Sequence, residues 1–179
     1  YEVLVSNKTL YFRPPNNASR KTVTLDRNED LLEFSPRLST MGQVGQVEVR
    51  GWDPKQKELF ISKAGVGNET TTMEGSIGGA KVASQKFGKT THTIADVIVS
   101  SQAEANQIAL KLFNEMALNY VTGDGSCLGR SDLIPGTIVG IKGVGKRFSG
   151  LYYVTSVTHS YSKIQGYRTN FSVKRNAES

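Results

Sequence analysis

The sequence has very few of the residues that build disulfide bonds and metal centres. It contains one cysteine, Cys127, and two histidines, His92 and His159. A single cysteine excludes an internal disulfide framework and any zinc cluster built from cysteines. Two isolated histidines are a thin basis for any other metal site. We therefore expect neither a metal nor a cofactor.

Long apolar runs are also lacking. No run approaches the roughly 18–20 residues that a membrane-spanning helix needs, so we expect no membrane span. Proline is scarce, with 5 residues, whereas glycine is abundant, with 18 of 179. This balance favours β-structure with many turns over a helical bundle. The chain begins at Tyr1 rather than methionine and has no signal peptide, so we expect it to be part of a longer protein.

The chain is moderately basic, with a formal net charge of +6. Its last third combines cations with tyrosines, a mixture that can bind single-stranded nucleic acid. These cations alternate with apolar residues along predicted strands, which favours solvated strand faces instead. No nucleic-acid partner is therefore expected. The cations are Lys142, Lys146, Arg147, Arg168, Lys174 and Arg175.

Most of the chain has the pattern of β-strands. In 43–52, Val47 and Val49 alternate with polar residues, which is typical of an antiparallel strand with one solvated face. Within 153–157 the apolar phase slips by one residue, which predicts a β-bulge. The other expected strands are a hairpin at 1–13 and runs at 22–25, 31–38, 58–62, 94–99, 137–142, 151–161 and 166–174.

One amphipathic helix is predicted over about 101–121. Ser101 and Glu104 have the spacing of a capping box, and an apolar stripe follows at helical spacing. Gly123 and Gly125 are read as the residues that end this helix. Because only one stripe is apolar, we expect the helix to pack on a sheet. The predicted fold class is therefore α+β, mainly antiparallel β.

The segment 64–92 has no apolar periodicity and is rich in glycine and threonine. It predicts a long loop or an extended hairpin, inserted into a single folded unit that spans 1–179. Long loops of this kind often carry binding functions. We therefore regard 64–92 as a candidate contact with neighbouring subunits.

Three segments have partial similarity to reactive sites: a phosphate-binding loop, a catalytic histidine and a reactive cysteine. Gly140, Gly145 and Lys146 match part of a phosphate-binding loop, but the hydroxyl residue is missing and a strand-like run follows instead of a helix. We interpret this segment as a glycine-rich β-turn. His159 has no nucleophile-elbow motif beside it and is expected to hydrogen-bond locally. Cys127 follows the predicted helix, where nothing lowers a thiol pKa, and is expected to be a packing residue.

Segments spread over the whole chain occur in the order seen in one known family. They are LEFSPRL (32–38), VEVRGWD (47–53), SQAEA (101–105), GDGSCLG (123–129), LIPGTIV (133–139), GKRFSGLYYVTSVTH (145–159) and YRTNF (167–171). In this order they resemble the phage late control gene D proteins and their VgrG-like relatives, the baseplate hubs of contractile tails and injection systems. The C-terminal block is the most specific part, and 64–92 carries none of the resemblance.

The resemblance implies a structural role. Such hubs resemble tail-tube proteins in fold, with β-barrels and a packed helix, and each subunit carries two barrels. They are homotrimers that join the tail tube to the central spike, although a fragment need not form the trimer. No catalytic residue comes with the resemblance, so no enzyme is expected. The implied location is the virion tail or injection apparatus, assembled in the bacterial cytoplasm.

Two other functions stay open on the residues alone. One is a basic β-barrel module that binds nucleic acid or another polyanion, and the other is a hydrolase that uses His159. The first would show binding that weakens steeply with salt. The second would lose its activity when His159 is replaced by alanine.

Overall fold

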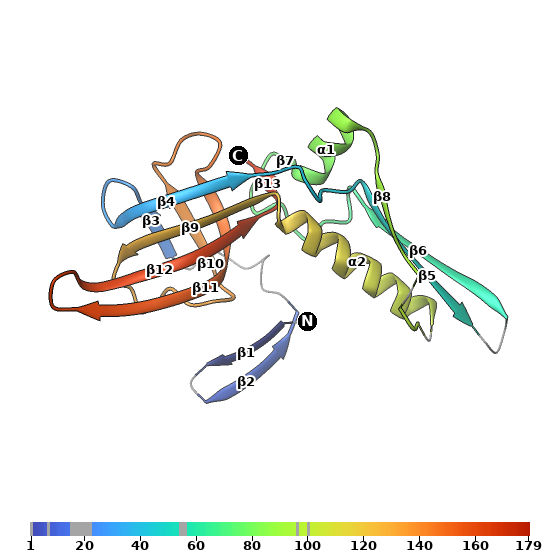
Figure 1. Ribbon diagram of the computed structural model, residues 1–179, viewed down its shortest axis with the longest axis horizontal. Helices are drawn as coiled ribbons and strands as arrows, with labels where there is room; N and C mark the ends of the chain where they lie inside the picture. The colour runs from blue at the N-terminus through green and yellow to red at the C-terminus, as the bar shows by residue number, and fades with distance from the viewer. Residues whose placement is uncertain (1, 7, 15–22, 54–56, 96, 100) are drawn as a thin grey trace.

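The computed structural model describes residues 2–6, 8–14, 23–53, 57–95, 97–99 and 101–179 (Figure 1). These residues form a curled six-stranded sheet, a three-stranded sheet covered by a long helix, and a separate two-stranded hairpin. The predicted α+β class, mainly antiparallel β, is confirmed. The expected barrel takes the form of a half-barrel, because the curled sheet stays open between its edge strands β3 and β4.

The half-barrel has the strand order β3-β10-β11-β12-β9-β4, and only the β3–β10 pair is parallel. The predicted bulge is confirmed, because the β11–β12 register shifts between Val154 and Ser156. The strands are β3 (Val23–Asp26), β4 (Leu31–Leu38), β9 (Val121–Leu128), β10 (Ile138–Lys142), β11 (Gly150–Ser162) and β12 (Gly166–Arg175).

The prediction that Gly123 and Gly125 end the long helix is wrong, because both residues lie in strand β9. Gly123 and Gly125 lie in the middle of the sheet, beneath the rings of Phe34 and Phe171. A Cβ on Gly125 would come within 2.6 Å of the Phe171 ring and 2.8 Å of the Glu33 carbonyl oxygen. The glycines therefore make room for the aromatic core of the half-barrel, and they do not cap a helix.

The second sheet has the order β6-β5-β8, with β5 (Gln46–Asp53) antiparallel to β6 (Glu58–Gly65) and parallel to β8 (Thr91–Ile94). The predicted strand at 94–99 is wrong in its bounds, since the strand ends at Ile94. His92, expected in a loop, lies in β8. Val47 and Val49 are fully buried on the face that packs against the long helix.

The long helix α2 (Gln102–Leu118) confirms the predicted amphipathic helix. Its N-cap is Ser101, whose hydroxyl accepts a hydrogen bond from the backbone N–H of Glu104 at 3.2 Å. Its buried stripe, which includes Phe113, packs on β5 and β6. Among the helices that the structure describes, none is both long and apolar enough to cross a membrane.

The segment 64–92 contains more regular structure than its sequence predicts. It begins with the end of β6 and includes β7 (Ile77–Gly78), which pairs with β13 (Ala177–Glu178), and the helix α1 (Gly79–Phe87). The helix was missed because its buried residues are only Gly79, Ala80 and Ala83 and its N-cap, Gly78, offers no side chain. Gly79 is required here, because an added Cβ would lie 2.1 Å from the Tyr120 ring.

The N-terminal hairpin is formed by β1 (Glu2–Ser6) and β2 (Thr9–Arg13), as predicted. Within the described residues, these two strands pair only with each other. In Figure 1 the hairpin lies below the middle of the molecule, and Glu2 of β1 accepts a hydrogen bond from the Tyr153 hydroxyl of β11. The middle of its turn, residue 7, is outside the described part of the chain.

Candidate functional site

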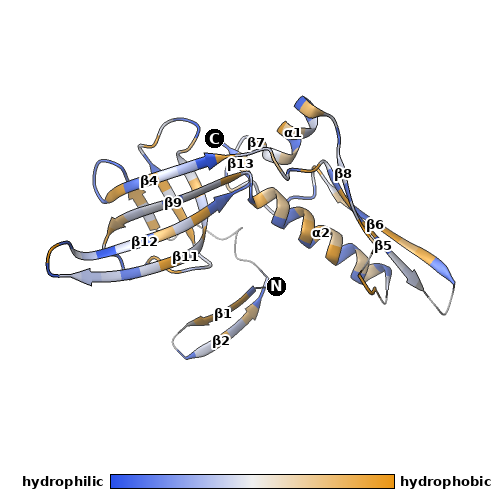
Figure 2. Cartoon of the chain, in the orientation of Figure 1, coloured by the Kyte–Doolittle hydropathy of each residue, from blue (hydrophilic) through white to orange (hydrophobic). Residues whose placement is uncertain are grey.

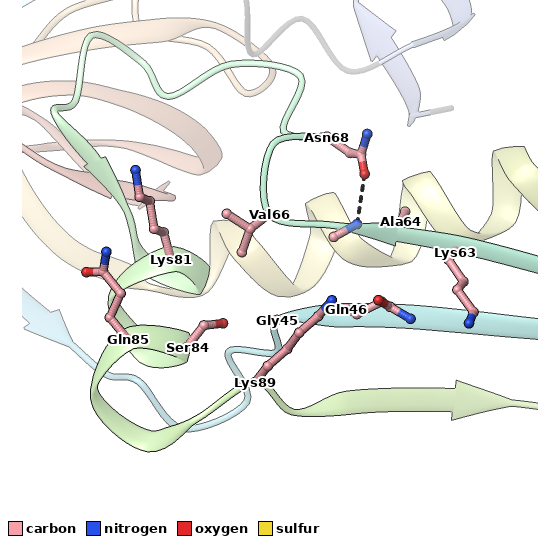
Figure 3. Close-up of a pocket in the computed structure, with 11 residues that line it drawn as sticks. Gly45, Gln46, Lys63, Ala64, Val66, Asn68, Lys81, Ser84, Gln85 and Lys89 are labelled. Carbon is pink, nitrogen blue, oxygen red and sulfur yellow. Dashed lines mark hydrogen bonds between the residues drawn. The ribbon is translucent and has the colours of Figure 1, made fainter.

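A basic cleft of about 410 Å³ lies between α1 and the adjoining ends of β5 and β6 (Figure 3). Its lining contains three lysines and several amides but no acidic side chain. The lining residues are Gly45, Gln46, Lys63, Ala64, Gly65, Val66, Asn68, Lys81, Ser84, Gln85 and Lys89. We call it the basic cleft.

Local packing fixes the walls of the basic cleft. The side-chain oxygen of Asn68 accepts a hydrogen bond from the backbone N–H of Gly65 at 2.9 Å, which holds the turn after β6 (Figure 3). The Ser84 hydroxyl donates to the Ala80 carbonyl at 2.8 Å within α1. Gly45 also lines the cleft. It lies close against α1, because a Cβ there would come within 2.7 Å of Ser84 Oγ.

The charge of the cleft is only partly compensated. Lys63 Nζ lies 3.2 Å from a carboxylate oxygen of Glu48, and Arg50 Nε lies 2.7 Å from the other oxygen. All three residues are on the face of β5 and β6 that points away from α2. The hydrogen bonds from Arg50 and Lys63 lower the pKa of Glu48. For Lys81 and Lys89, no ion pair with another described residue is seen. The cleft can therefore attract an anion.

The phosphate-loop imitation at 140–147 is a turn, as we interpreted it. Strand β10 ends at Lys142, and Gly143 and Gly145 take left-handed φ angles of 75° and 90°. Strand β11 follows from Gly150. Among the described residues, only a short turn at 146–148 separates these glycines from β11, so no helix begins here to receive a phosphate.

His159 and Cys127 are held by local interactions, as expected. His159 Nδ1 lies 3.1 Å from Thr169 Oγ1 and 3.1 Å from the Tyr167 hydroxyl. Cys127 is fully buried in the half-barrel core, and this burial raises its thiol pKa to about 11. A thiol with that pKa is protonated at neutral pH and is a poor nucleophile.

The cations of the last third do not gather into one surface. Arg175 is 1% exposed, with its guanidinium 5.6 Å from the Tyr152 ring centre. Arg147 pairs with Glu178 at 3.2 Å, and Lys174 donates to the Asn119 side chain at 2.8 Å. The basic cleft lies in another part of the chain. Sequence reasoning missed it because Lys63, Lys81 and Lys89 are far apart in sequence and no motif joins them.

No group of three or more histidine, cysteine or acidic residues converges on a possible metal position in the part of the chain that the structure describes.

The fold is similar to that of three solved tail proteins. The chain is similar to the 43 kDa tail protein of prophage MuSo2 from Shewanella oneidensis, with a TM-score of 0.62, 12% identity and 88% of this chain covered. A tail protein from Neisseria meningitidis MC58 is similar with a TM-score of 0.57 and 12% identity, over 88% of this chain. Prophage tail protein gp18 from Listeria monocytogenes EGD-e is similar with a TM-score of 0.54 and 14% identity, over 99% of this chain. The chain spans about half of these proteins: 45%, 45% and 49% of their lengths, respectively.

A family model also matches the chain over residues 2–163. The chain belongs to the family described as the Alg8 N-terminal domain. None of the curated proteins matches its sequence.

Proposed function

We propose that this chain is a structural component of a phage tail or a related contractile injection apparatus. Within that apparatus we assign it to the baseplate hub, which joins the tail tube to the central spike. The observation that carries the tail role is the shared fold, which extends over 88–99% of the chain in three tail proteins. The narrower hub role rests on the sequence segments that resemble the late control gene D and VgrG-like hubs.

The position of the protein in a particle tests both levels of this proposal. The full-length protein would carry a small C-terminal tag, and gold-labelled antibody would be located on purified particles by electron microscopy. We expect label at one end of the tail tube, next to the spike. Label along the whole tube would make the protein a tube subunit and would contradict the hub role. Particles without label, from cells that express the tagged protein, would contradict the tail role.

The proposed partners are further copies of the chain, the tail tube protein and the spike. We expect the full-length protein to form a homotrimer, which mass photometry would measure. The segment 64–92 stays our candidate for a subunit contact, but its deletion is a poor test. It would remove α1, whose buried alanines pack in the core, and the contact of Gly79 with Tyr120. Substitution of the exposed Lys81 and Lys89 leaves that packing in place.

A second candidate function is polyanion binding, favoured by the basic cleft. We expect Lys81→Gln with Lys89→Gln to weaken binding of a single-stranded oligonucleotide. The slope of the logarithm of the binding constant against the logarithm of salt concentration should fall by about 0.7 for each phosphate that a lysine no longer neutralises. Lys142→Gln with Lys146→Gln is the matched control, because these lysines are also exposed but lie outside the cleft. Equal losses of affinity in both pairs, or no binding at low salt, would contradict a specific site.

A further inference from the structure

The N-terminal hairpin has its apolar face turned outward. The register pairs Val3 with Phe12 and Val5 with Leu10, and directly paired residues share one face of a two-stranded sheet. These four side chains are 66–69% exposed. Figure 2 shows the hydrophobic colour on both strands of the hairpin. We call this set the hairpin face.

The opposite side of the hairpin carries the Glu2–Arg13 pair and Tyr11, and it touches the body of the protein through Glu2. Glu2 binds Arg13 at 2.9 Å and accepts a hydrogen bond from the Tyr153 hydroxyl of β11. Burial of Tyr153 and its bond to Glu2 raise the pKa of this tyrosine. The hairpin is thus held to the body by a charged residue, while the four apolar side chains of the hairpin face are exposed. A two-stranded hairpin has little stability in water unless another element covers its apolar face.

A second apolar surface lies at the far end of the β5–β6 hairpin, at the right of Figure 2. Trp52 and Leu59 are paired across the strands and are 57% and 53% exposed, and Ile98 beside them is 92% exposed. With Val97 they line a cavity of about 400 Å³. The two strand residues point away from α2, because their neighbours Gly51 and Phe60 face the core of this sheet. We call this surface the tip patch.

The two surfaces expose similar amounts of apolar area. The hairpin face consists of three aliphatic side chains and Phe12, whereas the tip patch lines a cavity and contains tryptophan, a residue type enriched in binding hot spots. Each exposes roughly 500 Å² of apolar side chain, more than isolated surface residues account for. Together they would bury roughly 1,000 Å², the lower limit for a specific interface.

We propose that the hairpin face of one chain docks into the tip patch of a second copy. Because the two surfaces lie on different parts of the molecule, the contact is head-to-tail, and each chain offers one surface of each kind. Contacts of this type close into rings when the rotation between subunits allows it. The inference deepens the proposed assembly role and rests on it, but its test needs only the purified protein.

Analytical ultracentrifugation of the full-length protein tests the contact. We expect Val5→Thr with Leu10→Thr, in the hairpin face, to weaken self-association at least tenfold. Leu59→Thr with Ile98→Thr, in the tip patch, should weaken it by a similar factor. Threonine removes apolar area but favours the extended backbone, so the strands should persist. Ile164→Thr is the matched control, because Ile164 is 96% exposed but lies in neither surface.

Mixing the two double variants gives the decisive measurement. A hairpin variant keeps its tip patch and a tip variant keeps its hairpin face, so the mixture should form one contact per pair and yield dimers. Each variant alone should stay monomeric. Overturning results are a wild-type protein that stays monomeric, a mixture that stays monomeric, or a loss confined to one of the two double variants. None of these results would move the antibody label on the particles, so this inference and the tail role fail separately.

Discussion

At the residue scale, glycine decides how closely the layers of this molecule approach. Gly125 lies between the Phe171 ring and the backbone of β4, and both are within 2.8 Å of where a Cβ would be. A methyl group there meets a backbone carbonyl, which cannot turn aside as a flexible side chain would. Glycine in the middle of a strand is normally unfavourable, so its presence marks a close approach.

We expect Gly125→Ala to lower the free energy of unfolding by about 1–3 kcal/mol, the usual cost of overpacking a core. Urea denaturation monitored by circular dichroism would measure it. The control is Ser126→Ala, one residue along the same strand on its polar face, which should change stability by less than about 0.5 kcal/mol. Equal effects of the two substitutions would contradict the packing role of Gly125.

Cys127 gives the molecule a pH dependence at the same scale. Its thiol pKa is about 11 in the folded chain against an ordinary value of 9.0, because burial disfavours the thiolate. The folded state therefore binds more protons than the unfolded state between these values, and stability should fall as pH rises from about 9 to 11. Below pH 9 the contribution is complete. The slope from one such group is at most about 1.4 kcal/mol per pH unit.

Unfolding free energies measured at a series of pH values across this window would test the dependence. We expect Cys127→Ala to flatten part of the decline. Tyr120 and Tyr153, whose pKa values are raised by burial and by their carboxylate partners, and Tyr152, whose pKa is raised by burial, should contribute to the remainder. An unchanged profile in the variant would mean that the thiol is not the titrating group.

At the scale of elements, local signals identified some pieces well. Helix α2 was predicted because its cap and apolar stripe are both visible in a short window of sequence. Strand β9 was missed for the opposite reason. Its glycines look like helix terminators, and only Phe34 and Phe171, which come from β4 and β12, explain them. Helix α1 was missed because small residues bury it and no side chain caps it.

The cap of α2 gives a prediction at this scale. We expect Ser101→Ala to lower the free energy of unfolding by about 1 kcal/mol, because the backbone N–H of Glu104 would lose its hydrogen bond to the Ser101 hydroxyl. Ser101→Gly should cost only about a few tenths of a kcal/mol. Thermal denaturation would compare both with Gln107→Ala, at an exposed position inside the helix. Equal losses for the alanine and glycine variants at Ser101 would contradict the capping role.

At the scale of the whole molecule, surfaces from distant segments combine. The basic cleft joins Lys63 from β6 with Lys81 from α1 and Lys89 after it. The tip patch joins the β5–β6 hairpin to Ile98. Neither surface has a sequence motif, because each is made by packing. The cations of the last third were predicted to lie on solvated strand faces, yet Arg175 turns into the core.

Hydrogen exchange gives the prediction for the assembled molecule. In the dissociated protein, we expect the amides of β1 and β2 to exchange among the fastest of all strands, since neither strand pairs with another sheet within the described residues. Self-association should slow exchange in these strands and at the tip patch. Amides of β9 and β12, in the middle of the half-barrel sheet, are the internal control. Unchanged exchange in the hairpin on association would contradict its docking.

Local sequence patterns were enough to predict the α+β class, the long helix, most strands, the bulge in β11, the hydrogen bonding of His159 to its neighbours and the packing of Cys127. These features follow from periodicity, capping and composition within short windows, which act before distant parts of the chain meet. Only the folded structure showed the position of β9, the helix within 64–92, the basic cleft and the exposed apolar face of the N-terminal hairpin. Each of these depends on contacts between residues far apart in sequence, and such contacts leave no local pattern.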